Sequence, residues 1–245
     1  MLSLPGDRRV PRASAVVPAG RAMKPTILRD TARAPDGTVL TLHEHDGEFL
    51  IRAGGVELMS TRQHYSEERL AALACAPLAL ARQPRVVIGG LGFGFTLRAA
   101  LEILPDAARV IVAELVPAVV AWNRDPAYGL AGGLLDDPRV VVTIADVADV
   151  IARRTAPFDA ILLDVDNGAA ALANASNARL YTDAGLARAR DALVPGGCLA
   201  VWSAVDDPDF VARMRRCGLA VATERARVHA TGGAWNHLFI GRRPR

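Results

Sequence analysis

The sequence predicts an α/β fold: a Rossmann-like, methyltransferase-type seven-stranded sheet with a small N-terminal antiparallel β-meander. From Arg85 onward, short apolar runs alternate with stretches of helical character, which is typical of a doubly wound sheet. Before that point, residues 25–60 contain short β-like pieces separated by turn signals such as Asp46-Gly47 and Gly54-Gly55. The length of 245 residues suits one such domain with a small appendage.

The chain divides into three predicted parts. We expect residues 1–22 to be a disordered basic tail, residues 23–62 a small β-domain, and residues 63–245 a Rossmann-like nucleoside-binding domain. Residues 1–24 hold five basic residues against one acidic residue, a charge of +4, whereas the whole chain carries +3. The basic charge therefore belongs to the tail and indicates no nucleic-acid partner. Met23 opens the first segment of structured character, so whether the tail is part of the native protein stays open.

Composition indicates a soluble, cytoplasmic protein. Hydrophobic residues make up 51% and charged residues 22%, as in ordinary globular domains. The longest apolar run, residues 70–81, is too short to cross a bilayer, so we expect no membrane partner. Cys75, Cys198 and Cys217 are far apart and form no CxxC pair, which indicates neither a disulfide framework nor a zinc site.

The pattern predicts each element in turn. In the meander we expect strands at residues 38–43, 49–52 and 56–59. A helix over 66–81 follows, with Ser66 as its N-cap and with Glu67 and Glu68 in its first turn. Five buried strands are expected at residues 85–88, 110–113, 140–144, 160–163 and 198–202. Helices are expected between them at roughly 95–104, 116–123, 147–154 and 183–193, the last ending at the turn Pro195-Gly196-Gly197. A helix near 207–216 and strands near 219–224 and 235–241 complete the count.

A glycine-rich turn, Gly89-Gly90-Leu91-Gly92-Phe93-Gly94, joins the first of these strands to a helix. Glycines let a ligand approach the backbone closely, and the helix N-terminus supplies unpaired N–H groups. The dinucleotide pattern G-x-G-x-x-G is absent, because Phe95 or Leu97 fills its third glycine slot. The spacing Gly90-x-Gly92-x-Gly94 is instead that of S-adenosylmethionine sites. Taken alone, the motif is also compatible with a purely structural strand–turn–helix connection.

Acidic residues follow the next strands. Glu114, 22 residues after Gly92, is placed to accept both ribose hydroxyls, and Asp146 to meet the adenine amino group. The plainer alternatives are a surface acid for Glu114 and a helix N-cap for Asp146. Asp164 and Asp166 follow the fourth strand. Because ligands bind at the carboxyl ends of such strands, we expect one site for the co-substrate. Its predicted residues are Gly89, Gly90, Gly92, Gly94, Glu114, Asp146, Val147 and Asp164.

Over about residues 37–241, these motifs resemble the spermidine and spermine synthases, the polyamine aminopropyltransferases. The resemblance rests on the meander, the glycine hexad at 89–94, Glu114, the Asp137-Pro138-Arg139-Val140 stretch leading to Asp146, the Asp164 loop, Leu180-Tyr181 and residues 193–197. It implies S-adenosylmethionine or its decarboxylated form as co-substrate, a small-molecule amine or other small acceptor, and no metal. A homodimer is compatible with it. It also implies that Asp164 and Asp166 deprotonate the acceptor amine.

The sequence departs from the family's pattern around the acceptor. The family's glycine loop reads GGGDGG and its Asp holds the amine of the co-substrate, whereas this chain has Gly92 in that slot. A glutamine expected near Leu58 is absent, and Asn167 replaces the second acid of the family's D-x-x-D loop. The family's helix-opening tyrosine is expected near Ser66 or Glu67, and in this chain the adjacent residue Tyr65 is the nearest tyrosine. We expect pocket residues at His64, Tyr65, Asn167 and Tyr181.

The leading interpretation is therefore an aminopropyl transfer to an amine. One alternative is an S-adenosylmethionine-dependent methyltransferase acting on a small molecule, which Gly92 favours because a glycine does not repel the carboxylate of intact S-adenosylmethionine. On that ground we expect intact S-adenosylmethionine to bind at least as well as the decarboxylated form. The other alternative is a non-catalytic nucleoside-binding relative.

Overall fold

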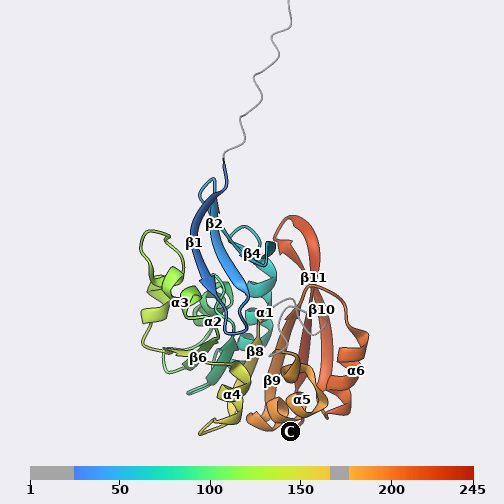
Figure 1. Cartoon of the computed structure of the whole chain (residues 1–245). Helices are drawn as coiled ribbons and strands as arrows, with labels where there is room; N and C mark the ends of the chain where they lie inside the picture. The colour runs from blue at the N-terminus through green and yellow to red at the C-terminus, as the bar shows by residue number, and fades with distance from the viewer. Residues whose placement is uncertain (1–24, 166–176) are drawn as a thin grey trace, which may run out of the picture.

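The computed structural model describes residues 25–165 and 177–245 and contains two sheets (Figure 1). The predicted tail, Asp166 and Asn167 lie outside the described residues. An antiparallel sheet is formed in chain order by β1 (Ile27–Arg33), β2 (Val39–His45), β3 (Glu48–Ala53) and β4 (Val56–Ser60). It lies over one end of a seven-stranded sheet with the order β10-β11-β9-β8-β5-β6-β7. The predicted fold class is confirmed.

The larger sheet is mostly parallel. Its strands are β5 (Arg85–Gly89), β6 (Arg109–Glu114), β7 (Val140–Ile144), β8 (Phe158–Leu163), β9 (Leu193–Ser203), β10 (Ala220–His229) and β11 (Gly232–Arg242). Only β11 pairs antiparallel with its two neighbours, β9 and β10. The carboxyl ends of β5, β6, β7 and β8 therefore meet at one edge of the sheet, below the meander.

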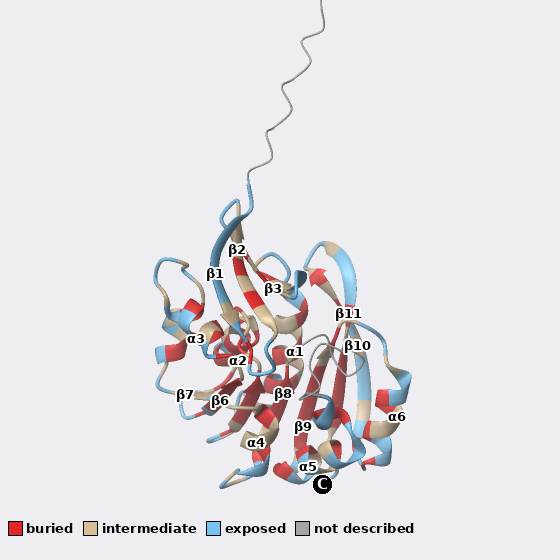
Figure 2. Cartoon of the chain, viewed as in Figure 1, coloured by how far each residue is buried: buried red, intermediate tan, exposed pale blue. Residues whose placement is uncertain are grey.

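Helices cover both faces of this sheet. On one face lie α1 (Tyr65–Cys75), α2 (Phe95–Ile103) and α3 (Pro117–Arg124), and on the other α4 (Val147–Ala152), α5 (Asp183–Ala192) and α6 (Pro208–Arg216). Adjacent residues of a strand enter opposite cores: Val86 and Ile88 pack with the first group, and Val87 with the second. Two-sided burial explains the nearly continuous apolar runs in the central strands, which Figure 2 shows as buried. The part of the chain that the structure describes has no helix long and apolar enough to cross a membrane.

Three local predictions were wrong. Ser66 is not the N-cap of α1, because the helix begins at Tyr65 and Ser66 is buried inside it, accepting hydrogen bonds from Trp202 and Asn236. The helix ends at Cys75 rather than at residue 81, since Pro77 has no N–H to continue it. The predicted turn at residues 195–197 lies within β9 instead. The strand β1 was not predicted as a separate element.

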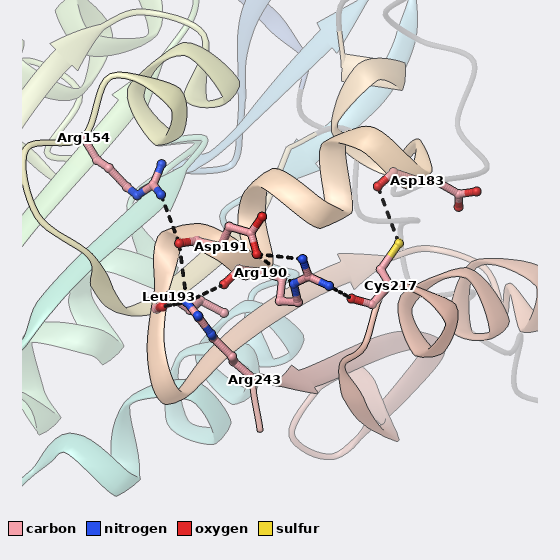
Figure 3. A network of polar contacts seen from close by, with 7 residues as sticks. All are labelled: Arg154, Asp183, Arg190, Asp191, Leu193, Cys217 and Arg243. Atoms are coloured by element: carbon pink, nitrogen blue, oxygen red, sulfur yellow. Dashed lines mark hydrogen bonds and ion pairs between the residues drawn. The ribbon is translucent and has the colours of Figure 1, made fainter. Parts of the chain in front are cut away.

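A network of hydrogen bonds lies at the end of the larger sheet where its parallel strands begin, away from their carboxyl ends (Figure 3). Arg190 near the end of α5 donates to the carbonyl of Cys217 at 2.7 Å, and Arg243, just after β11, donates to the carbonyl of Leu193. Arg154 donates to the carbonyl of Asp191 at 3.0 Å. These contacts join α4, α5, α6 and the end of β11, and so hold the helices of one face to the sheet edge.

Candidate functional site

A first cavity of about 120 Å³ lies at the carboxyl ends of β5, β6, β7 and β8. The strand ends form its floor, and residues of the meander, including Ile51 and Met59, cover it. Four of its lining residues carry carboxylates, and no Lys, Arg or His is among its described lining residues. The four are Asp36, Glu114, Asp146 and Asp164. The cavity is thus apolar in its walls and negative in its polar groups.

The glycine loop holds an arrangement that side chains would block. Gly90 has a φ of +88°, and a Cβ there would lie 2.2 Å from the carbonyl oxygen of Asp164. Gly94 has a φ of +80° and occupies the N-cap position of α2. The buried side chain of Asn123 donates to the carbonyl of Gly92 at 2.8 Å and fixes the middle of the loop. Gly89 and Val147 are two further residues of the predicted co-substrate site. Gly89 ends β5 and packs so closely against Val147 that a Cβ would not fit between them.

Glu114 ends β6 and is buried, with only 8% of its surface exposed. Its two carboxylate oxygens accept hydrogen bonds from the backbone N–H groups of Leu91 and Val116, at 2.9 and 2.8 Å. The structure therefore does not place Glu114 as the surface acid of the plainer alternative. The carboxylate ties the glycine loop to the end of β6 and lines the first cavity, and each of its oxygens has the capacity to accept more than one hydrogen bond.

Asp146 caps α4: its side chain accepts a hydrogen bond from Ala148 N at 2.7 Å. Its other oxygen lies 2.7 Å from the guanidinium of Arg179, which also pairs with Asp149. The N-cap that the sequence offered as an alternative is present. Asp146 still lines the first cavity, so the cap and a ligand contact do not exclude each other.

Asp164 follows β8 and lines the first cavity and also a second one. The hydroxyl of Thr96, in the first turn of α2, donates to its carboxylate at 2.5 Å. Burial raises the pKa of Asp164 to about 6, and the Thr96 hydrogen bond acts in the opposite direction. A carboxyl group with that pKa is largely ionised at neutral pH and is basic enough to accept a proton.

The second cavity, of about 350 Å³, lies between α1, the meander and the β10–β11 hairpin. Its walls include the aromatic residues Trp202, Trp235 and Phe95. Three carboxylate residues line it, Glu57, Glu67 and Asp164, and among its described lining residues there is again no Lys, Arg or His. Such a cavity suits a small cation with an apolar part.

The two cavities meet at a shared boundary formed by Leu58, Met59, Gly92 and Asp164, which line both. The sulfur of Met59 lies 3.1 Å from where a Cβ of Gly92 would be. A ligand in the first cavity and a ligand in the second therefore approach each other beside the Asp164 carboxylate. This arrangement suits a transfer between two bound molecules with Asp164 at the point of contact.

The remaining predicted pocket residues lie elsewhere. His64 stacks on Phe95, with ring centroids 4.3 Å apart, and lines neither cavity. Tyr65 is 38% exposed, and Tyr181 is buried in the core beside Phe210. Neither tyrosine lines either cavity.

The structure adds residues that sequence reasoning did not select. Met59, Thr96 and Asn123 contact the glycine loop or Asp164, and Glu67 lines the second cavity. The sequence marks Glu67 as an acid in the first turn of a helix, where acids stabilise the helix itself, and as a position near which the resembled family has a tyrosine. Neither signal predicts that its carboxylate faces a cavity.

Comparisons with known proteins agree with the resemblance seen in the sequence. No family model matches the chain. The polyamine aminopropyltransferases of Mycobacterium tuberculosis and Mycobacterium bovis are 31% identical to it over 159 residues, 61% of this chain and 29% of theirs. The match thus spans less than a third of the length of these relatives.

Solved structures share the fold. A spermidine synthase in complex with the transition state analogue AdoDATO has a TM-score of 0.67 and 19% identity, covering 87% of this chain and 72% of that one. The spermidine synthase from Thermotoga maritima has the same score and coverage at 20% identity. A probable spermidine synthase from Corynebacterium glutamicum has a TM-score of 0.60 at 21% identity, covering 88% and 80%. The predicted spermidine-synthase-like fold on a methyltransferase-type sheet is confirmed.

Proposed function

We propose that this protein is a transferase that binds decarboxylated S-adenosylmethionine in the first cavity and transfers its aminopropyl group to an amine in the second. The observation that carries this proposal is the meeting of two cavities at Asp164, both lined by carboxylates and, among their described lining residues, by no basic side chain. The names of the polyamine aminopropyltransferases and spermidine synthases similar to this chain support the same reaction.

The nucleoside fits the first cavity by its chemistry. Glu114 accepts the ribose hydroxyls, Asp146 lies toward the adenine amino group, and Gly90 and Gly92 allow close approach. The sulfonium is a cation and is attracted by the surrounding carboxylates. Donors that carry phosphate are disfavoured by the same charges, which separates this site from dinucleotide sites.

The reaction needs alignment and a base more than further activation, because the sulfonium is already a good leaving group. The acceptor arrives as an ammonium ion and gives a proton to the Asp164 carboxylate. The nitrogen then forms a bond to the carbon beside sulfur. The bond between that carbon and sulfur breaks with its electron pair remaining on sulfur, which leaves neutral methylthioadenosine and the extended amine.

A methyltransferase using intact S-adenosylmethionine is the second candidate, favoured by Gly92 and Met59 at the boundary. Neither residue offers a charge to hold the aminopropyl amine or to repel a carboxylate. The two candidates leave different products, methylthioadenosine for aminopropyl transfer and S-adenosylhomocysteine for methyl transfer.

The test is incubation with each donor and a panel of primary amines, followed by mass spectrometry of the nucleoside product. We expect methylthioadenosine from the decarboxylated donor, and an amine extended by one aminopropyl unit. S-adenosylhomocysteine without methylthioadenosine would establish the methyltransferase instead. Thermal stabilisation by both donors with neither product would identify a non-catalytic binding protein.

A further inference from the structure

Glu67, on helix α1, is one of two acids of the second cavity that the strand-end motifs do not include, the other being Glu57. Its Oε2 atom is buried and has no hydrogen-bond partner among the described residues. Its neighbour Glu68 differs, because its Oε1 lies 2.7 Å from Nδ1 of His64. Of two consecutive acids on one helix, one lies beside a histidine and the other has a buried carboxylate oxygen without a hydrogen-bond partner at the wall of a cavity.

This position destabilises the ionised form of Glu67. Its pKa is raised well above the usual range, first by burial and then by repulsion from Asp164 and Glu68, while its own backbone N–H acts in the opposite direction. Glu57 on β4 lines the same cavity, and none of the described lining residues is basic. A buried polar group without a partner costs free energy, so the fold alone does not explain this side chain.

Other polar side chains of the cavity are already engaged. The hydroxyl of Ser66 accepts from Trp202 Nε1 and Asn236 Nδ2, each at 3.0 Å. Asp164 accepts from Thr96. Glu67 differs from them, because one of its carboxylate oxygens is buried without a hydrogen-bond partner, and the aromatic residues of the same cavity suit an alkylammonium ion.

We propose that Glu67 binds the ammonium group of the acceptor and positions its nitrogen against Asp164. The inference rests on the proposed function, because it assigns a residue to the acceptor side of that reaction. It places the second acid of the acceptor site on a helix at the cavity wall. An ammonium ion beside Glu67 favours its ionised form and so lowers its raised pKa, which links binding of the acceptor to the release of protons.

The test is calorimetric titration of the full chain with 1,4-diaminobutane, with and without saturating methylthioadenosine, in two buffers of different ionisation enthalpy. The two buffers give the number of protons released on binding. The variants are Glu67→Gln, which keeps the shape and removes the charge, and Glu57→Gln, which removes an exposed charge at the same cavity. Butane-1,4-diol, of the same length without charge, is the control ligand.

We expect Glu67→Gln to weaken diamine binding about tenfold or more and to lose most of the proton release, with diol and methylthioadenosine binding unchanged. Glu57→Gln should change diamine affinity by about threefold at most. A Glu67→Gln variant that binds the diamine within about twofold of wild type, or that releases the same protons, would overturn the inference.

The melting temperature separates this role from a structural one. If Glu67 stabilised the fold, Glu67→Gln would melt lower, whereas a binding residue left without a partner predicts an unchanged or higher melting temperature. Failure of the donor proposal shows separately, as a wild type that does not bind methylthioadenosine. The titration without nucleoside then still decides the role of Glu67.

Discussion

Asp164 combines a proposed catalytic role with a cost in stability. Its pKa is raised by burial to about 6, above its usual 3.8, so the folded state binds a proton more tightly than the unfolded state. The stabilisation that this gives is fully present below the unfolded pKa and is lost as the pH rises through about 6. At neutral pH the ionised group therefore works against folding while it serves as a base.

We expect Asp164→Asn to be more stable than wild type at about pH 7, by roughly 2–3 kcal/mol, and equally stable at about pH 3.5. Turnover should fall by about 100-fold or more, because the acceptor proton has nowhere to go. Melting curves of both proteins across this pH range test the expected change in stability. Product formation at neutral pH tests the expected fall in turnover. A constant difference in stability at all pH values would contradict the titration of Asp164.

Glu114 has both a structural and a proposed binding role, and its variants should separate them. Glu114→Ala leaves the N–H groups of Leu91 and Val116 without their carboxylate partner, so stability should fall by about 1–3 kcal/mol. Methylthioadenosine affinity should also fall, by roughly 1.5–3 kcal/mol. Glu114→Gln should lose less of both. Normal nucleoside affinity in a folded alanine variant would leave Glu114 with the structural role alone.

Met59 bears on the effect of introducing at position 92 the Asp that the resembled family has there. A Cβ at Gly92 would meet the Met59 sulfur at 3.1 Å, and the φ of +52° is one that Asp tolerates better than most residues. We expect Gly92→Asp alone to weaken both donors, because the thioether crowds the new side chain. Gly92→Asp with Met59→Ala should prefer decarboxylated over intact S-adenosylmethionine by about 1–2 kcal/mol more than wild type does. Competition binding of the two donors measures this, with Met59→Ala alone as the control.

At the scale of elements, the sequence was most informative where both faces of a strand are buried. The runs at β5 and β8 are largely apolar, because most of their side chains enter one of the two cores, and their bounds were predicted to within two residues. The bounds of the edge strand β7 were also predicted, although its side chains are half-buried or exposed. β1 was missed because it is an exposed edge strand with no clear alternation. Its place depends on pairing with β2, which local sequence does not encode.

The residues of the site likewise divide into those that local sequence predicts and those that depend on packing between distant elements. Glu114 and Asp164 were predictable because strand carboxyl ends converge by topology. Glu67 and Ser66 were not, because only the packing of α1 against β9 and β11 decides which side of that helix is buried. Ser66 illustrates this, since its contacts, Trp202 and Asn236, lie more than a hundred residues away in the chain.

The network in Figure 3 gives a prediction for the opposite end of the sheet. Arg243→Ala removes a donor to the carbonyl of Leu193 and should lower the free energy of unfolding by about 1 kcal/mol. Arg216→Ala is the matched control, because Arg216 and its partner Asp183 are both largely exposed and 3.8 Å apart. Urea denaturation compares them. Nucleoside affinity should stay unchanged in both, since neither residue lines the cavities.

For the whole molecule, the distribution of charge selects the ligand. The formal net charge is +3, yet the two cavities gather carboxylates, and their described lining residues include no base. Residues of the meander and α1 line the cavities at the strand ends, and the partial burial there strengthens interactions between charges. The site therefore favours cations on both sides of Asp164, whatever the overall charge of the protein.

This distribution predicts exclusion of phosphate. Adenosine and its 5′-monophosphate share the base and the ribose hydroxyls, so Glu114 and Asp146 contribute equally to both. The phosphate adds about two negative charges at neutral pH, close to Asp164 and the glycine loop. We expect the monophosphate to bind at least about tenfold more weakly than adenosine, with the gap narrowing as salt screens the repulsion. Displacement of methylthioadenosine at low and high salt measures the affinity ratio and its salt dependence. Equal affinities of the two compounds at low salt would mean that the carboxylates do not set the selectivity of the first cavity.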